Sequence, residues 1–471
     1  MRTTLCWQLS NAVAIAMSSK LHLPMDQLSE LLRPLLSGTV ALSTEGPPRW
    51  STFGAPQPNI VVDVTTEADV AKVVKYCSKN NIPFLAQNGG VGWAAFNLSN
   101  GVLINIAPLN EVAFSEDKTQ AIVGGGASVK QTIDAAHAAG VLVVTGNCNC
   151  VGTIGAVLGG GYGNLIGEYG FGVDNVLSFN LVTARGELLN VSPTSHPDLF
   201  WAVRGAGPNF GIVTSAVMKA HPTSDRTAWN MALIFTPDKI KQVVQAVEDL
   251  RPQLLPAQNV FMYLTNSGPP DNQPVILVTG FLLQTTEEEA RAAFSGVYAV
   301  GPLSENSGIL PYDQWNTGGD AFCTREMRKP GHTIGISKLH PDQWQEIWDL
   351  YAEFRSKPGA ENSVMIVEIY NLEKPRSIPE SSSAFAHRDV NAQALVIPWY
   401  ADPALDEEAM AFAKKVRGIT GANEEKTTAY VNFAHGDEGL EAVYGESLPR
   451  LKDIKRQWDP KGRFNQWFPI K

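Results

Sequence analysis

Short apolar runs alternate with helical patterns in the first half of the chain. Short buried strands are predicted at 60–64, 82–87, 102–109, 120–126 and 141–146. Residues 65–81 and 128–140 repeat apolar side chains at helical spacing, the first behind a Thr cap and an acidic first turn, the second ending at Gly140. This alternation predicts an α+β or α/β unit with short strands.

Longer strands follow from about Thr227. They are predicted at 228–235, 259–266, 274–283, 363–370 and 392–400. Helices between and after them are predicted at 239–250, 286–297, 342–355 and 407–417. Because the strands lack phosphate-type glycine loops, we expect an antiparallel sheet backed by helices, and we take it as a substrate domain.

The fold class is therefore α+β, in two main parts. We expect a helical lead-in at 1–50, a first domain at 51–224, the substrate domain at 225–428, and a C-terminal segment at 429–471. That last segment is rich in aromatic residues, which predicts that it packs back onto the first domain.

The composition narrows the classes of partner. Apolar residues make up 44% of the 471 residues, which is enough for a full core. With 37 basic against 47 acidic residues, the net charge of −10 lacks the basic footprint of a nucleic-acid-binding protein. No run of 18 apolar residues occurs, so no membrane-spanning helix is expected.

Cysteine and histidine usage bears on compartment and metals. The five cysteines are an odd number, which excludes a full disulfide framework and favours an intracellular, cytoplasmic protein. The eight histidines are scattered without HExxH or CxxC, so no metal site is expected. The stretch from Met1 to about residue 19 is read as a helix, and a secretory signal, implying a secreted protein, is the alternative.

Glycine is concentrated in one part of the chain. Fourteen of the 41 glycines lie within 121–172, and glycine is useful where the main chain approaches a ligand closely. This density favours a large flat ligand held by main chain over a set of hairpin turns.

Four segments carry the candidate chemistry and bring in a family. They are QNGGVGW (87–93), TGNCNCVGTIGAVLGGGYG (145–163), DLFWAVRGAGPNFGIVT (198–214), and the tail from YVNF to DPKGRF (430–464). With these motifs in order, the chain resembles the berberine bridge enzyme-like FAD-linked oxidases. They belong to the wider type of vanillyl-alcohol oxidase and p-cresol methylhydroxylase (PCMH). The dinucleotide fingerprint of a Rossmann unit is missing, which fits this different flavin fold.

The resemblance implies FAD as cofactor, in a two-part PCMH-type FAD-binding domain. Main-chain N–H groups of the 88–92 loop would hold the pyrophosphate. The loop's histidine, which bonds to the flavin 8-methyl group in the family, is replaced here by Val91, so that link cannot form. The residues expected to contact FAD are Asn88, Gly89, Gly90, Val91, Gly92, Thr145, Cys148, Val151, Gly152, Gly155, Gly160, Gly163, Val213 and Asn432.

Cys148 stands at the position of the family's second link, to flavin C6. Covalent attachment through Cys148 and non-covalent FAD remain open as alternatives. The residue at Val151 lines the space over flavin C4a in the family, and a small side chain there implies access for oxygen. Gly159–Gly163 would form a strained turn under the flavin ring.

Two residues are candidates for the catalytic base. Glu368 is an acid on an otherwise apolar strand, where burial would raise its pKa, but it fits the solvent face of a half-buried strand equally well. Tyr430 and Asn432 match the family's YxN pattern, so Tyr430 would accept a proton or orient the substrate.

The resemblance implies an oxidase that moves hydride from a small organic, secondary-metabolite substrate to the flavin, with oxygen as acceptor. A redox-neutral isomerase or cyclase is the alternative, because Ile366 and Leu395 would line the substrate site. A flavin-bearing binding protein without turnover is a third hypothesis.

Overall fold

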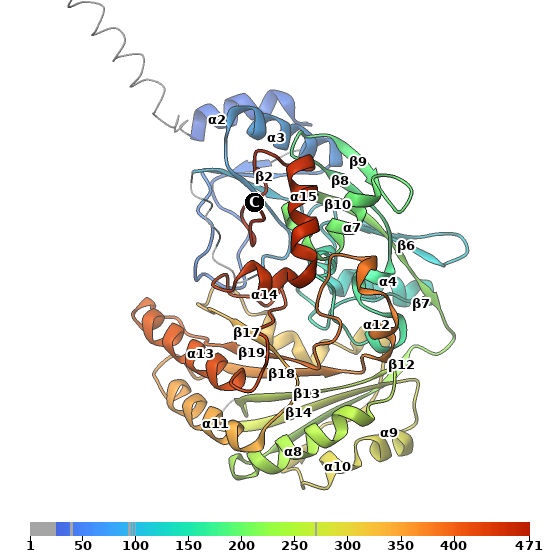
Figure 1. The fold of residues 1–471 in the computed structure, drawn as a ribbon, viewed down its shortest axis with the longest axis vertical. Helices are drawn as coiled ribbons and strands as arrows, with labels where there is room; N and C mark the ends of the chain where they lie inside the picture. Colours follow the sequence, from blue (N-terminus) through green and yellow to red (C-terminus); the bar gives the residue numbers. More distant parts are fainter. Residues whose placement is uncertain (1–24, 38–40, 93–95, 97, 99, 269–270) are drawn as a thin grey trace, which may run out of the picture.

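The structure is a computed structural model that describes residues 25–471 except 38–40, 93–95, 97, 99 and 269–270. The reading of the N-terminal stretch as helix or signal, and the last residue of the 87–93 motif, lie outside these residues. The α+β fold class is confirmed, with the chain forming an upper part of small sheets and a lower part built on one large sheet (Figure 1).

The first small sheet has four strands in the order β1-β2-β4-β3. The strands are β1 (Ala41–Ser43), β2 (Ile60–Asp63), β4 (Val102–Asn105) and β3 (Phe84–Gln87), and β2, β4 and β3 run parallel. Helix α3 (Glu67–Asn80) begins where the Thr66 side chain accepts a hydrogen bond from the N–H of Asp69, as the sequence pattern predicts.

The second small sheet is antiparallel, with five strands in the order β5-β6-β10-β8-β9. The strands are β5 (Val112–Phe114), β6 (Gln120–Gly124), β10 (Ile212–Lys219), β8 (Val176–Val182) and β9 (Leu188–Val191). Helix α4 (Val129–Ala139) ends at Gly140, whose φ of 81° is the left-handed conformation that glycine adopts readily. The strand predicted at 141–146 is shorter: only β7 (Val141–Leu142) pairs, with β11 (His221–Pro222).

The large sheet has eight strands, and its described strands all pair antiparallel. Its order is β15 (Ser304–Glu305), β12 (Thr227–Phe235), β14 (Pro274–Leu283), β13 (Gln258–Asn266), β18 (Val364–Tyr370), β19 (Ala392–Ile397) and β17 (His332–Ile336), and β16 (Gly308–Pro311) also pairs with β12. Helices α8 (Ile240–Leu250), α11 (Pro341–Arg355) and α13 (Asp406–Thr420) cover its lower face (Figure 1). The antiparallel sheet backed by helices is confirmed.

The two faces of this sheet have different neighbours. On β18, Met365, Val367 and Ile369 pack in a core with the covering helices. The alternate residues point the other way, because successive strand side chains alternate between faces. Ile366 packs with Trp50 and Val91, and Tyr370 joins the core of the upper part. The sheet therefore presents an inner face toward the predicted FAD-binding domain.

The remaining helices are short, and two close the chain over the upper part. They are α2 (Met25–Leu32), α5 (Thr153–Leu158), α6 (Ile166–Tyr169), α7 (Pro197–Ala206), α9 (Glu287–Ala293), α10 (Ser295–Tyr298), α12 (Glu373–Ser377), α14 (Leu440–Tyr444) and α15 (Leu448–Trp458). Helices α9 and α10 replace the single helix predicted at 286–297. Helices α14 and α15 pack back on the upper part (Figure 1), and Lys455 of α15 donates to the carbonyl of Asn209 at 2.7 Å.

Candidate functional site

The loop after β3 meets the 148–152 segment through close main-chain contacts. Asn88 Nδ2 donates to the carbonyl of Gly125 at 3.0 Å, and this bond fixes the start of the loop. A Cβ on Gly89 would lie 2.7 Å from the Cys150 carbonyl oxygen, closer than any side chain tolerates. Gly90 has a φ of +63°, which also favours glycine. The two motifs predicted to bind the cofactor are thus brought together.

Two arginines from other parts of the chain, which the sequence analysis did not identify, donate hydrogen bonds to this loop. Arg49 Nη1 donates to Gln87 Oε1 at 2.8 Å, and Arg325 Nη1 donates to the carbonyl of Gly89 at 2.9 Å. Burial, and then the charge of Arg325, lowers the pKa of Arg49 to about 10. Neither arginine forms an ion pair with a described carboxylate, and Arg49 Nε has no described partner. Two cations beside a loop of main-chain N–H groups fit an anionic diphosphate.

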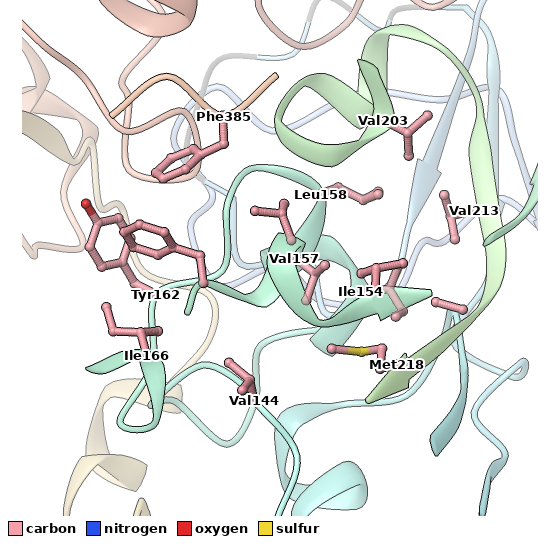
Figure 2. Close-up of a cluster of buried hydrophobic side chains, with 14 of the residues drawn as sticks. Val144, Ile154, Val157, Leu158, Tyr162, Ile166, Val203, Val213, Met218 and Phe385 are labelled. Atoms are coloured by element: carbon pink, nitrogen blue, oxygen red, sulfur yellow. The ribbon is translucent and has the colours of Figure 1, made fainter. Parts of the chain in front are cut away.

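Helix α5 buries one face and leaves the other bare. Ile154, Val157 and Leu158 point into the core against Val203 of α7 and Val213 of β10 (Figure 2). Gly155, on the opposite face, is exposed, and a Cβ added there would meet no atom within 4 Å. The main chain at Gly155 is therefore open to a flat ring system.

The glycines of the turn after α5 lie against other parts of the chain. A Cβ on Gly159 would lie 2.2 Å from Asn432 Oδ1, one on Gly160 would lie 2.7 Å from the Phe385 ring, and one on Gly163 would lie 1.8 Å from the Thr145 carbonyl oxygen. These glycines let the chain pack closely against its own neighbours. Of the candidate glycines in the 145–163 segment, Gly155 is the one that faces open space.

Tyr430 and Asn432 anchor α5 and its turn. Asn432 Nδ2 donates to the Ala156 carbonyl and to the Tyr430 hydroxyl, both at 2.7 Å. The Tyr430 hydroxyl also accepts the N–H of Gly161 at 3.0 Å. Burial raises the pKa of Tyr430 to about 12, so its hydroxyl stays protonated near neutral pH. The lowered pKa that a Tyr430 base would need is not present.

Glu368 lies on the inner face of the large sheet, which decides between the two placements predicted for it. It stands in register with Phe261 of β13 and Gln393 of β19. The Tyr370 hydroxyl donates to Glu368 Oε2 at 2.8 Å and accepts from Asn147 Nδ2 at 2.9 Å. Burial raises the pKa of Glu368 to about 7, although the bond from Tyr370 acts in the opposite direction.

Two buried acceptors near Glu368 have no described partner. They are Oδ1 of Asn147, whose Nδ2 donates to Tyr370, and Oε1 of Gln393, whose Nε2 donates to the Tyr162 hydroxyl at 3.1 Å. Buried polar atoms are rarely left unpaired, because each costs about 1–3 kcal/mol. Asn147 Oδ1 and Gln393 Oε1 therefore fit a ligand that brings N–H or O–H donors to the surroundings of Glu368.

One pair of cysteines is joined. Cys150 and Cys323 form a disulfide across 173 residues of sequence, and the odd cysteine number excludes only a full framework, not a single bond. Cys148 is free, and its Sγ lies 3.5 Å from Cys150 Sγ and 3.8 Å from Cys323 Sγ. Burial, and then the charges of Asp320 and Glu368, raise the pKa of the Cys148 thiol.

The other predicted cofactor contacts divide by exposure. Val91 and Val151 are partly exposed, and Val91 packs against the apolar cluster of Trp50 and Ile366. Thr145 and Val213 are buried, at 8% and 3% exposed, so Val213 offers a ligand little besides main chain.

Among the described residues, no helix is long and apolar enough to span a membrane.

Two family models match the chain. The model of an FAD binding domain matches residues 58–192, and the model described as berberine and berberine like matches residues 429–470. The first covers the loop at 88–92 and helix α5, and the second covers Tyr430 and Asn432.

Similar sequences come from fungi. The chain is 30% identical to the FAD-linked oxidoreductase anuG of Penicillium roqueforti over 97% of this chain and 94% of anuG. It is 33% identical to the FAD-linked oxidoreductase OXR1 of Pyricularia oryzae, over 90% of this chain and 86% of OXR1.

Solved structures share the fold. The BBE-like 1 protein of Physcomitrella patens matches with a TM-score of 0.81 at 19% identity, over 94% of this chain and 99% of that one. Glucooligosaccharide oxidase from Acremonium strictum, which carries a 6-S-cysteinyl, 8α-N1-histidyl FAD, matches with a TM-score of 0.78 at 17% identity, over 93% and 99%. The chain belongs to the berberine bridge enzyme-like FAD-linked oxidoreductases, and FAD is its cofactor.

Proposed function

We propose that this protein is an oxidase that takes hydride from a small organic substrate, of the secondary-metabolite kind, with oxygen as acceptor. The observation that carries the proposal is Glu368, a carboxyl with a pKa raised to about 7 on the face of the sheet that meets the FAD-binding domain. Bound FAD supplies the two-electron acceptor.

Glu368 acts as the general base in this proposal. Its carboxylate accepts the proton that leaves the substrate as the C–H bond breaks, and a pKa near neutral suits that exchange. Tyr370 holds Oε2 of the carboxylate by its hydrogen bond, while Asn147 orients Tyr370. The free oxygens of Asn147 and Gln393 accept hydrogen bonds from the substrate or the flavin ring.

The inner face suggests how the substrate is oriented. Next to Glu368 and Gln393 the strands continue with Ile366 and Leu395, which pack with Trp50 in a separate apolar cluster. An alcohol or amine donor at the Glu368 end, joined to an apolar body, matches this change from polar to apolar lining. The fungal relatives, named as FAD-linked oxidoreductases, support a biosynthetic role.

Attachment of FAD can involve at most one of the two covalent bonds that the glucooligosaccharide oxidase forms with its FAD. Val91 has no nucleophilic atom, and Cys148 is the free thiol in the motif. Acid precipitation of the wild-type protein should either release all flavin or retain it through Cys148. In the second case the Cys148→Ala protein should release it. Flavin that stays attached in Cys148→Ala would contradict the assignment.

The Cys150–Cys323 disulfide bears on location. Disulfides persist in oxidising compartments and are rare in the cytoplasm. It therefore supports the secreted alternative over the cytoplasmic location expected from the odd cysteine number. Fractionation of cells that express the tagged chain tests this, and a chain found in the cytosol with its cysteines reduced would restore the first expectation.

Turnover of a substrate panel tests the oxidase. We expect hydrogen peroxide in proportion to a product that is two hydrogens lighter than the substrate, and both should form far more slowly in Glu368→Gln. A product of unchanged mass without peroxide would instead favour the redox-neutral isomerase or cyclase. The apolar lining by Ile366 and Leu395 beside a single acid keeps that alternative open.

A further inference from the structure

Three sulfur atoms form a cluster that the proposed oxidase reaction does not use. Sγ of Cys148, Cys150 and Cys323 all lie within 4.8 Å of one another, and all three residues are partly buried. Cys77, the other described cysteine, is buried elsewhere, in the core of the first small sheet. The cluster therefore holds one thiol and one disulfide side by side.

We propose that Cys148, Cys150 and Cys323 form a thiol–disulfide exchange site, in which the Cys148 thiolate displaces Cys150 from the disulfide and leaves Cys150 as the free thiol. A new bond forms between Sγ of Cys148 and Sγ of Cys323, and the bond between Cys150 and Cys323 breaks. The proton lost from Cys148 is gained by Cys150, so the exchange needs no external oxidant or reductant.

The three sulfur atoms are close enough for this reaction once the Cys148 side chain has moved into line with the disulfide. Cys148 Sγ stands 3.8 Å from Cys323 Sγ and 3.5 Å from Cys150 Sγ, so it lies beside the disulfide and must rotate before it can attack Cys323 along the axis of the bond. Attack on Cys150 would instead form a Cys148–Cys150 disulfide, which closes a small ring with Asn149 as the one residue between the two cysteines. Asn149 is buried and donates from Nδ2 to Asp320 Oδ1 at 2.7 Å, which opposes the rearrangement that such a ring requires. Cys323 is therefore the sulfur that we expect to be attacked.

Contacts other than the disulfide hold the cluster in place. Cys148 and Cys150 lie between β7 and α5, and Cys323 ends the short 3-10 segment Thr317–Cys323. Two hydrogen bonds join these segments: Asn149 Nδ2 donates to Asp320 Oδ1, and Asn316 Nδ2 donates to the Gly146 carbonyl at 3.3 Å. Neither bond involves a sulfur atom, so the exchange does not have to break either of them.

The exchange has a consequence for the cofactor. Cys148 is the residue proposed to attach FAD, and in the exchanged form its sulfur is engaged with Cys323. The pairing of the disulfide would then decide whether a thiol is available for attachment. This consequence rests on the proposed attachment, whereas the exchange itself does not.

Disulfide mapping of variants tests the exchange. Purified Cys150→Ser protein, exposed to glutathione disulfide, is quenched in acid, digested and analysed by mass spectrometry. We expect the Cys148–Cys323 pair in most molecules, and acid-released flavin in those molecules. Free Cys323, whether Cys148 is free or carries flavin, would overturn the proposal. Cys77→Ser should keep the wild-type pairing, since Cys77 lies in another core.

Slow alkylation of the wild-type protein gives a second readout. With limiting iodoacetamide at mildly alkaline pH, we expect label on both Cys148 and Cys150, together with Cys148–Cys323 linked peptides. Cys148→Ser should abolish the label on Cys150. Label or flavin confined to Cys148, with the Cys150–Cys323 bond intact in every molecule, would overturn the exchange. Neither readout requires turnover, so loss of the oxidase assignment would leave this test unaffected.

Discussion

At the scale of single residues, two opposed effects set the pKa of Glu368. Burial in the inner face raises its pKa, and the hydrogen bond from Tyr370 lowers it, with burial the larger effect. The result, about 7, leaves comparable populations of carboxylate and carboxylic acid near neutral pH. Sequence reasoning could propose this residue from an acid in an apolar strand. It could not predict the face that Glu368 occupies, because the remaining residues of β18 are buried on both faces of the sheet.

Replacement of Glu368 should remove the reaction without removing the cofactor. General-base catalysis contributes about 100- to 10,000-fold, so the turnover rate of Glu368→Gln should fall by that factor. In the wild type, kcat/KM should rise with pH through about 7, because only the deprotonated carboxyl can accept the proton. Steady-state kinetics from pH 5 to pH 9 measures both. A flat wild-type profile would argue against Glu368 as the base.

Replacement of Tyr370 should shift that pH profile upward. Tyr370→Phe removes a hydrogen bond that favours the carboxylate, so the pKa of Glu368 should rise and the profile should move to higher pH. Tyr351→Phe, in the core on the opposite side of the sheet, serves as control and should leave the profile in place. An unmoved midpoint in Tyr370→Phe would show that the bond does not tune the base.

Val151 carries the expectation of oxygen access. Val151→Leu adds one methylene, a change that closely packed sites feel. We expect slower reoxidation of the reduced protein by oxygen and near-normal anaerobic reduction by substrate, both measured by stopped-flow absorbance. Equal reoxidation rates with FAD content intact would mean that Val151 only packs against the core beside it.

At the scale of elements, periodicity identified the long strands and helices but missed α5. Its sequence, TIGAVL, lies in a glycine-rich stretch, and glycine disfavours helix by about 1 kcal/mol. The helix forms because Ile154, Val157 and Leu158 bury one face and Asn432 binds the Ala156 carbonyl at its C-terminal end. Both contacts come from distant parts of the chain, so a local pattern could not predict them.

Helix α15 fixes the C-terminal segment through a buried charge. Lys455 Nζ donates to Asp459 Oδ2 at 2.7 Å and to the carbonyls of Asn209 and Phe464 at 2.7 and 2.8 Å. Lys455→Met leaves the buried Asp459 carboxylate unpaired, so the free energy of unfolding should fall by about 3–5 kcal/mol. Denaturant unfolding measures this.

Arg456→Met on the same helix is the matched control. Arg456 pairs with Asp453, and both side chains are exposed, at 66% and 69%, so its loss should be nearly neutral. Equal unfolding midpoints for the two variants would show that the Lys455 network contributes nothing specific.

At the scale of the whole molecule, the site is assembled from segments that no single motif contains. The four motifs indicate the flavin fold, and the family models at 58–192 and 429–470 cover most of them. Arg49, Arg325 and Cys323 lie outside those motifs, yet they contact the loops at 87–92 and 148–150. Their positions follow from the packing of the large sheet against the first domain, which depends on contacts spread over the chain.

This assembly predicts that Arg49 stabilises the molecule chiefly when FAD is bound. In the Cys148→Ala background, where neither covalent bond can form, Arg49→Met removes a cation beside the main-chain cradle. Loss of one charge-assisted hydrogen bond of about 1.5–3 kcal/mol should weaken FAD binding by about 10- to 100-fold.

Thermal melts with increasing FAD should then show a smaller rise in Tm than in the parent, because stabilisation depends on ligand concentration relative to Kd. Melts without FAD should change little, since burial, and then the charge of Arg325, lower the pKa of Arg49 and oppose its charged form in the folded chain, which offsets the loss of its hydrogen bond to Gln87. An unchanged dependence of Tm on FAD would place the diphosphate away from Arg49.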